Sequence, residues 1–280
     1  MQLLFGKPVA DKMLAELKEN IERETIKPGL AVLLIGEDKA SHIYVSLKEK
    51  RAKEIGMNFF RFDIAVKVSE DEIISKIKEL NVDERVHGII VQLPLPEGFN
   101  TDRIIKTIDP KKDADGFHLE NAQKFLNGES EIWPVFPRAI VKMLESSGEN
   151  LNGRMAVVIA NSKEFAGIMV AALNKKGLNA KYVLSSELPS YLGQIKNANV
   201  VVSAVGSPGL LRGEMLLDGS IIIDGGIEKV GESILGDVDF GSTEGISGYI
   251  TPVPGGVGPL TIACLLENTY LAFKAQQKEN

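Results

Sequence analysis

Helical and extended hydrophobic patterns alternate along the chain. Apolar residues recur at helical spacing from Val9 to Ile21, and further patterns predict helices at 41–55, from Ser69, at 137–146 and at 261–274. Apolar extended runs predict strands at 30–35, 57–64, 88–93, 155–160, 180–184, 200–204 and 220–224. Strands that alternate with helices form parallel sheets with right-handed crossovers. We therefore expect an α/β protein with parallel sheets.

The length of 280 residues suits two domains of common size. Residues 1–120 together with 260–280 are predicted to form the first domain, because the last helix follows a Gly/Pro loop and can pack back on it. Residues 121–259 are predicted to form a second, Rossmann-like domain.

Composition and charge exclude some classes of protein. With 44% hydrophobic and 25% charged residues and a net charge of −6, the chain is typical of a soluble protein and lacks the basic footprint of a nucleic-acid binder. Cys264 is the only cysteine, so an intramolecular disulfide or a cysteine metal cluster is excluded, and its neighbours predict burial on a helix. The N-terminus does not resemble a signal peptide, and no apolar run reaches the roughly 20 residues of a membrane helix. We expect a cytoplasmic protein without a membrane partner or a bound metal.

Parallel sheets bind ligands beyond the carboxyl ends of their strands. Tyr44 and Lys48 stand one helical turn apart, and Gln92 is the one amide in an apolar strand. The loop 112–118 holds two carboxylates, and 251–259 holds three Pro and three Gly. Taken singly, the first three features also suit a surface pair, a buried hydrogen-bond network and a turn or helix cap.

The order and the amino-acid sequences of these segments resemble those of the methylenetetrahydrofolate dehydrogenase/cyclohydrolase (FolD) family over almost the whole chain. The matching motifs are Tyr44-x-x-x-Lys48-x-Lys50, 91–96 (Val-Gln-Leu-Pro-Leu-Pro), 112–118, 236–240 (Gly-Asp-Val-Asp-Phe) and 250–259. The resemblance implies a cleft between the domains that holds folate. It also implies NADP-dependent oxidation of 5,10-methylenetetrahydrofolate to 5,10-methenyltetrahydrofolate, hydrolysis of that product to 10-formyltetrahydrofolate, and a homodimer.

By the same resemblance, the catalytic residues are Lys48, Gln92 and Tyr44, with Tyr44 stacked on the aminobenzoyl ring and Asp115 bound to the pterin amino edge. The implied folate-binding residues are Tyr44, Lys48, Val91, Gln92, Leu93, Asp115, Pro254, Gly255, Gly256, Val257 and Gly258. A lysine that is partly desolvated near a developing cation has a lowered pKa, which suits it to act as a base.

The second domain departs from the family pattern. The implied cofactor-binding positions are Ala160, Asn161, Ser162, Ser186 and Ile227, and two of them differ where the family has Gly-Arg-Ser. Ala160 adds a methyl group near the phosphates, and Asn161 removes a cationic partner for the 2′-phosphate of NADP. NAD is therefore an alternative to NADP as the cofactor. Two alternative functions also fit the sequence: a cyclohydrolase with weak or lost dehydrogenase activity, and a non-catalytic folate- or nucleotide-binding protein.

Another departure lies at 133–137 (Trp-Pro-Val-Phe-Pro), where the family usually has Pro-Cys-Thr-Pro. Phe136 either narrows the cleft or simply packs against its neighbours, and the sequence does not distinguish these two alternatives. An unrelated NAD-dependent dehydrogenase of small acids would leave 251–259 unexplained.

Overall fold

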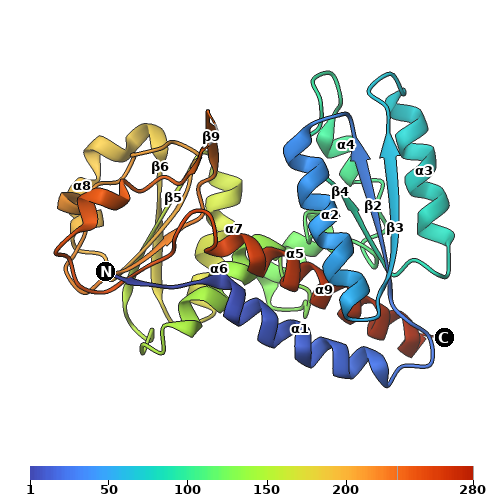
Figure 1. Cartoon of the computed structure of the whole chain (residues 1–280), viewed down its shortest axis with the longest axis horizontal. Coiled ribbons are helices and arrows are strands. Elements are labelled where there is room, and N and C mark those ends of the chain that lie inside the picture. Colours follow the sequence, from blue (N-terminus) through green and yellow to red (C-terminus); the bar gives the residue numbers. More distant parts are fainter. Residues whose placement is uncertain (232, 280) are drawn as a thin grey trace. The chain divides into compact units, whose positions relative to one another are not determined.

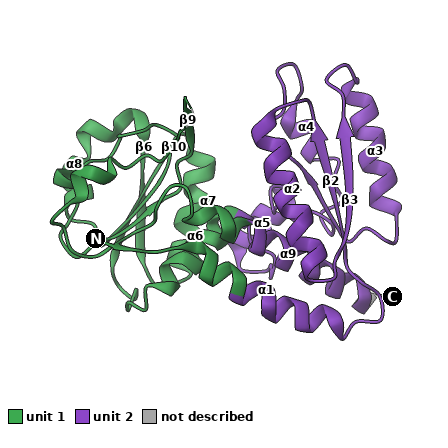
Figure 2. Cartoon of the chain, viewed as in Figure 1, with its two compact units in different colours: residues 1–11, 136–261 green, residues 12–135, 262–280 purple. Residues whose placement is uncertain are grey.

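The computed structural model describes residues 1–231 and 233–279, and the chain forms two compact units (Figures 1 and 2). Unit 1 comprises Met1–Asp11 and Phe136–Thr261, and unit 2 comprises Lys12–Val135 and Ile262–Asn280. The α/β class with parallel sheets is confirmed. Among the described residues, no helix combines the length and the apolar character needed to cross a membrane.

Besides residues 260–261, which fall in unit 1, these units differ from the expected domains in two longer segments. Residues 1–11 belong to unit 1, because the short strand β1 (Gln2–Leu3) pairs with β11 (Tyr249–Ile250). Residues 121–135 belong to unit 2, where the Trp133 carbonyl accepts a hydrogen bond of 2.8 Å from the side chain of the distant Asn268. Both differences rest on contacts between distant parts of the chain, which local patterns do not reveal.

Unit 2 is built on a parallel sheet of three strands in the order β3-β2-β4. Its elements are β2 (Gly29–Ile35), α2 (Lys39–Glu54), β3 (Asn58–Ile64), α3 (Glu70–Val82), β4 (Gly88–Val91), α4 (Thr101–Ile105) and α5 (Leu119–Asn127). One face of β2 packs on Ile73 and Ile77 of α3. The alternate residues of β2 are equally buried, so both faces of the strand are covered, as its continuous apolar sequence predicts.

The predicted strand at 88–93 ends two residues early, at Val91. Gln92 still donates its backbone N–H to the Leu33 carbonyl at 2.8 Å, but Pro94 has no N–H with which to continue the pairing. The polar side chain of Gln92 therefore stands at the carboxyl end of the sheet.

Unit 1 is built on a parallel sheet of six strands in the order β1-β11-β8-β7-β5-β6. Its further elements are α6 (Val135–Ser146, which starts at the last residue of unit 2), β5 (Met155–Ala160), α7 (Lys163–Asn174), β6 (Asn179–Leu184), η1 (Ser185–Ser190), α8 (Leu192–Lys196), β7 (Val200–Ala204), η2 (Gly213–Met215), β8 (Ile221–Asp224), β9 (Glu228–Val230), β10 (Ser233–Leu235) and η3 (Phe240–Thr243). Because β5 has β6 on one side and β7 on the other, the strand order reverses beside β5. Such a switch point is the usual ligand site of an open α/β sheet.

Two long helices pass from one unit into the other, α1 (Gly6–Glu22) and α9 (Val257–Glu279). The buried Cys264 lies in α9, as its apolar neighbours predict. The antiparallel pair β9–β10 and the short elements β1, β11, α4 and α5 were not predicted. Each spans at most nine residues, which gives a hydrophobic period little room to show itself.

Candidate functional site

Lys48 is a buried lysine of unit 2. It lies on α2, which begins at the N-cap Asp38, whose carboxylate accepts the backbone N–H of Ser41. The Lys48 side chain is only 6% exposed, and its Nζ donates a hydrogen bond of 2.8 Å to Gln92 Oε1. Burial lowers the pKa of Lys48, and the charge of Asp115 opposes that shift in part. A lysine in this setting gives up its proton more easily than one in water.

Two neighbours orient the lysine. Gln92 Nε2 donates to the Leu93 carbonyl at 2.7 Å, which leaves Oε1 to accept from Lys48. The Lys48 Nζ also lies 5.1 Å from the centre of the Tyr44 ring, one turn earlier on α2. The spacing seen in the sequence therefore does bring Tyr44 and Lys48 together, and Gln92 joins them from the end of β4.

Asp115 belongs to a loop that a second carboxylate holds in shape. Asp113 is buried and accepts hydrogen bonds from the backbone N–H groups of Gly116 and His118 and from the Asn121 side chain, at 2.9 to 3.1 Å. Asp115 itself is half-buried. The two acids predicted together thus have different environments, and Asp113 is the one whose bonds are those of a turn residue.

Burial raises the pKa of Asp115 to about 6, with a smaller increase from Asp113, while Lys48 acts in the opposite direction. The carboxylate and the lysine therefore influence each other's protonation. The pKa of Asp115 is thus raised and that of Lys48 is lowered, and shifted pKa values of this kind are common where protons are transferred.

The loop predicted to line the folate site, 254–258, belongs to unit 1. Thr251, which precedes it, is buried, and its Oγ1 accepts the backbone N–H of Asp224 at 2.8 Å. Gly255 has a positive φ of 105°, and a Cβ on Gly256 would lie 2.6 Å from the Pro252 carbonyl oxygen. Gly6 donates its N–H to Gly255 O at 2.9 Å. The loop is thus a fixed backbone structure that requires its glycines.

Two buried carboxylates organise the neighbouring loops of unit 1, and the sequence assigned no role to them. Asp224 accepts the backbone N–H groups of Gly226, Asp237 and Val238 at 2.9 to 3.0 Å. Asp237 accepts the Ser203 hydroxyl at 2.6 Å and the backbone N–H groups of the loop that follows β7. Burial raises the pKa of Asp224 to about 6. These carboxylates fix the loops at the carboxyl ends of β7 and β8.

A pocket of about 610 Å³ opens beside these loops in unit 1. Its lining includes Asp224, Thr251, Pro252 and Val253, which follow β8 and β11, together with Phe240. It therefore lies beyond the carboxyl ends of parallel strands, where such folds bind ligands.

The predicted cofactor turn follows β5 in unit 1. Ala160 is buried at the end of the strand, and Ser162 caps α7 by accepting the backbone N–H of Phe165. Asn161 donates from Nδ2 to the Val205 carbonyl at 2.9 Å and accepts the Ser185 hydroxyl at 2.7 Å. Its amide therefore ties together the ends of β5, β6 and β7.

The other cofactor candidates lie at neighbouring strand ends. Ser186 is exposed in η1 directly after β6, and Ile227 is 62% exposed after β8. The switch point, the N-terminus of α7 and the hydroxyls of Ser162 and Ser186 fit a dinucleotide.

Phe136 packs inside unit 1. Its ring centre lies 5.7 Å from that of Phe165, and a Cβ on Gly225 would lie 2.6 Å from its Cζ. Residue 225 is a glycine, whereas the family pattern that this chain resembles usually has valine at the corresponding position. The aromatic ring thus occupies the space that a side chain at 225 would need, and the two departures compensate each other.

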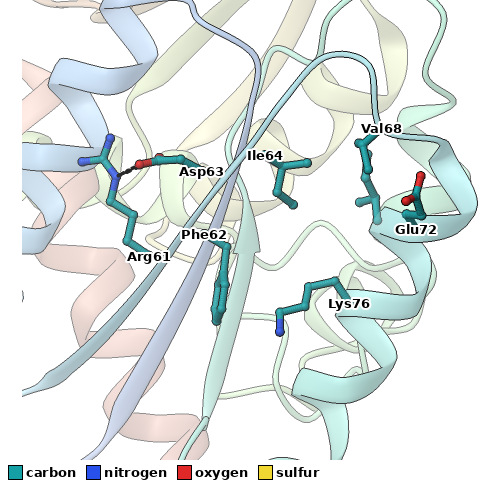
Figure 3. Close-up of a pocket in the computed structure, with 8 residues that line it drawn as sticks. Arg61, Phe62, Asp63, Ile64, Val68, Glu72 and Lys76 are labelled. Atoms are coloured by element: carbon teal, nitrogen blue, oxygen red, sulfur yellow. Dashed lines mark hydrogen bonds and ion pairs between the residues drawn. The ribbon is translucent and has the colours of Figure 1, made fainter.

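A second pocket, of about 420 Å³, lies between β3 and α3 in unit 2 (Figure 3). Arg61 pairs there with Asp63 at 2.9 Å, and the Lys76 ammonium lies 4.6 Å from the centre of the Phe62 ring. Glu72 takes part in the capping box of α3. These polar groups already serve the local fold, and none of the predicted site residues lines the pocket.

Comparison with known proteins bears on both units. Residues 4–115 match the family model "Tetrahydrofolate dehydrogenase/cyclohydrolase, catalytic domain", and residues 134–277 match "Tetrahydrofolate dehydrogenase/cyclohydrolase, NAD(P)-binding domain". The bifunctional protein FolD of Vesicomyosocius okutanii is 39% identical, over 99% of this chain and 100% of that protein. The matches therefore extend over nearly the whole chain.

Solved structures of the same kind of enzyme are similar to this chain over nearly its whole length. The methylenetetrahydrofolate dehydrogenase/cyclohydrolase of Campylobacter jejuni superposes with a TM-score of 0.92 and 37% identity, over 99% of each chain. The enzyme of Trypanosoma brucei, in complex with NADP and an inhibitor, gives a TM-score of 0.92 and 32% identity, over 98% of this chain and 97% of that one.

Proposed function

The chain belongs to the tetrahydrofolate dehydrogenase/cyclohydrolase family, and we propose that Tyr44, Lys48, Gln92 and Asp115 carry the folate chemistry of this enzyme. The dehydrogenase reaction converts 5,10-methylenetetrahydrofolate to the 5,10-methenyl cation, and the cyclohydrolase reaction hydrolyses that cation to 10-formyltetrahydrofolate. The observation that carries the proposal is the buried Lys48 ammonium, 2.8 Å from Gln92 Oε1. A protein that only binds folate has no need of a buried, oriented cation.

Lys48 is the proton-transfer group of the hydrolysis. In its neutral form it takes a proton from the water that adds to the methenyl carbon. The hydroxyl proton of the resulting adduct then passes to the leaving ring nitrogen as the carbon–nitrogen bond breaks, so that the net reaction releases one proton. Gln92 keeps the Lys48 Nζ oriented throughout, through the hydrogen bond to its Oε1.

Substrate recognition falls to the surrounding groups. The Tyr44 ring stacks on the aminobenzoyl ring, and the ionised Asp115 accepts hydrogen bonds from the pterin amino edge. Val91 and Leu93, which flank Gln92, contribute apolar contacts. The loop at 254–258 belongs to unit 1, and its contacts with folate stay a prediction.

The nucleotide site is the turn after β5. When bound, NADP would supply the hydride acceptor for the oxidation of the methylene carbon. The residues that would hold it are Ala160, Asn161 and Ser162 at the turn, with Ser186 and Ile227 at neighbouring strand ends. The N-terminus of α7 offers backbone N–H groups to the phosphates.

One observation favours a second candidate, a cyclohydrolase with weak dehydrogenase activity. The Asn161 side chain is engaged with Val205 and Ser185, so it is not free to pair with the 2′-phosphate as an arginine would. Homodimer formation and a cytoplasmic location stay predictions.

Absorbance at the methenyl-folate band separates these candidates. With methenyltetrahydrofolate as substrate and no nucleotide, the band should disappear much faster than in buffer alone. With methylenetetrahydrofolate, turnover should require NADP or NAD. Hydrolysis without nucleotide-dependent turnover would establish the second candidate, and the absence of both reactions would overturn the proposal.

A further inference from the structure

The buried amide of Asn268 links the loop that carries Asp115 to a second segment of unit 2. Asn268 lies on α9, has no exposed surface, and donates from Nδ2 to the carbonyls of Ala114 at 2.9 Å and Trp133 at 2.8 Å. We propose that Asn268 is a positioning residue for Asp115 and thereby sets the affinity of the enzyme for the pterin. The inference rests on the proposed function, in which Asp115 binds the pterin amino edge.

The two carbonyls bonded by Asn268 stand on either side of Asp115. Ala114 precedes it directly, and the segment after Trp133 closes over it, since the Val135 N–H donates to Asp115 O at 3.0 Å. Gly116 has a positive φ of 73°, and a Cβ there would lie 2.9 Å from Pro134 Cα. The backbone of Asp115 is therefore enclosed between two segments, and one side chain holds both.

An asparagine suits this position chemically. Its amide nitrogen carries two hydrogens, one for each carbonyl, and it adds no charge beside Asp115. A buried carbonyl that loses its donor is costly, so the two segments separate or admit water when the amide is removed. Asp113 still holds the loop through its own bonds to Gly116 and His118. Loss of Asn268 should thus displace Asp115 without unfolding the loop.

The same helix offers a matched control. Gln276 also donates from its amide nitrogen to two carbonyls, those of His87 at 3.0 Å and Lys111 at 3.1 Å. These bonds fasten α9 to unit 2 but contact neither residue 114 nor the segment that ends at Val135. A role that is only structural predicts similar behaviour for variants at the two positions.

The experiment measures kcat and KM for methenyltetrahydrofolate hydrolysis, with the melting temperature of each variant. In Asn268→Leu, KM should rise between about 10- and 100-fold, the range expected when a binding group is displaced by about an ångström, and kcat should fall less. Asn268→Ser keeps one donor and should lie between the wild type and Asn268→Leu. If Asn268→Leu does not fold, the KM of Asn268→Ser alone tests the inference. Gln276→Leu should lower the melting temperature but leave KM unchanged.

A double-mutant cycle with Asp115→Asn completes the test. If Asn268 acts through Asp115, its substitution should add little to the KM of Asp115→Asn. Fully additive losses, or a normal KM in folded Asn268→Ser, would overturn the inference while leaving the proposed function intact. A normal KM in Asp115→Asn itself would instead overturn the role of Asp115, and the inference with it.

Discussion

The proposed folate site of unit 2 and the proposed nucleotide turn of unit 1 match the family pattern to different degrees. In unit 2, Tyr44, Lys48, Gln92 and Asp115 all match the family motifs, and Lys48 is bonded to Gln92 at 2.8 Å. In unit 1, the strand β5, the turn after it and the helix α7 are present, but the side chains at the turn differ from the family pattern. Asn161 forms hydrogen bonds to the protein's own loops. Both units have the expected parallel sheet, although only the proposed folate site keeps the side chains of the family pattern.

The difference follows from how each site works. Proton transfer requires one functional group with a suitable pKa at one position, and no backbone atom can replace a lysine. A helix N-terminus binds phosphate largely through backbone N–H groups, which most residue types supply. Under the proposed function, side-chain changes at the turn therefore adjust affinity and cofactor preference, whereas a change at Lys48 removes a reaction step.

The largest effect is expected at Lys48. Lys48→Met should lower kcat for methenyltetrahydrofolate hydrolysis by about 10²- to 10⁴-fold, the usual contribution of a general acid or base, while folate binding survives. Lys53→Met, which removes an exposed cation from the same helix, should leave kcat unchanged. Near wild-type hydrolysis in Lys48→Met would remove this residue from the mechanism.

Asp115 comes next. Asp115→Asn should weaken folate binding in both reactions together by about one to two decades, because a charge-assisted hydrogen bond contributes roughly 1.5–3 kcal/mol. Since the pKa of Asp115 is raised to about 6, its carboxyl group loses its proton as pH rises through that value, and KM should fall over the same range. The variant should lose this pH dependence. A protein that folds poorly but binds folate normally would show that Asp115 is a turn residue.

The compensation between Phe136 and Gly225 can be tested through stability. Gly225→Ala places a methyl group against the Phe136 ring and should lower the free energy of unfolding by about 1–3 kcal/mol, as overpacking usually does. In a Phe136→Thr background the loss should be smaller. Urea unfolding measures both, with Gly193→Ala as a control in open space. Equal losses in the two backgrounds would mean that the two positions are independent.

The long regular elements and the closeness of Tyr44 to Lys48 could be predicted from the sequence, because apolar periods and one-turn helical spacing encode them. The strand at 155–160 and the Tyr44–Lys48 pair are examples, as the structure has both. The roles of the site residues came from the family resemblance and stay proposals. Contacts between distant segments could not be predicted in this way. Asn268 and Ala114 are 154 positions apart and come into contact only in the folded chain. The pairing of β1 with β11, which places residues 1–11 in unit 1, is another contact between distant segments.

The smallest expected effect concerns the nucleotide turn, and it measures how much the departures there matter. Ala160→Gly with Asn161→Arg should tighten NADP binding by about tenfold, since the arginine supplies a partner for the 2′-phosphate and the glycine lets the backbone approach. NAD lacks the 2′-phosphate, so it should respond to Ala160→Gly but not to Asn161→Arg. Equilibrium titration of both nucleotides with each single variant separates the two causes.

Two further measurements complete this test. Methenyltetrahydrofolate hydrolysis uses no nucleotide, so its rate should be the same in all the variants. Asn161→Arg also removes the bonds to Ser185 and Val205, and its melting temperature should therefore fall slightly. If the wild type already binds NADP at low micromolar concentration and the double variant binds no better, the turn holds the 2′-phosphate by another group. Lys163, the first residue of α7, is then the next cation to replace, because it lies at the helix end where phosphate binds.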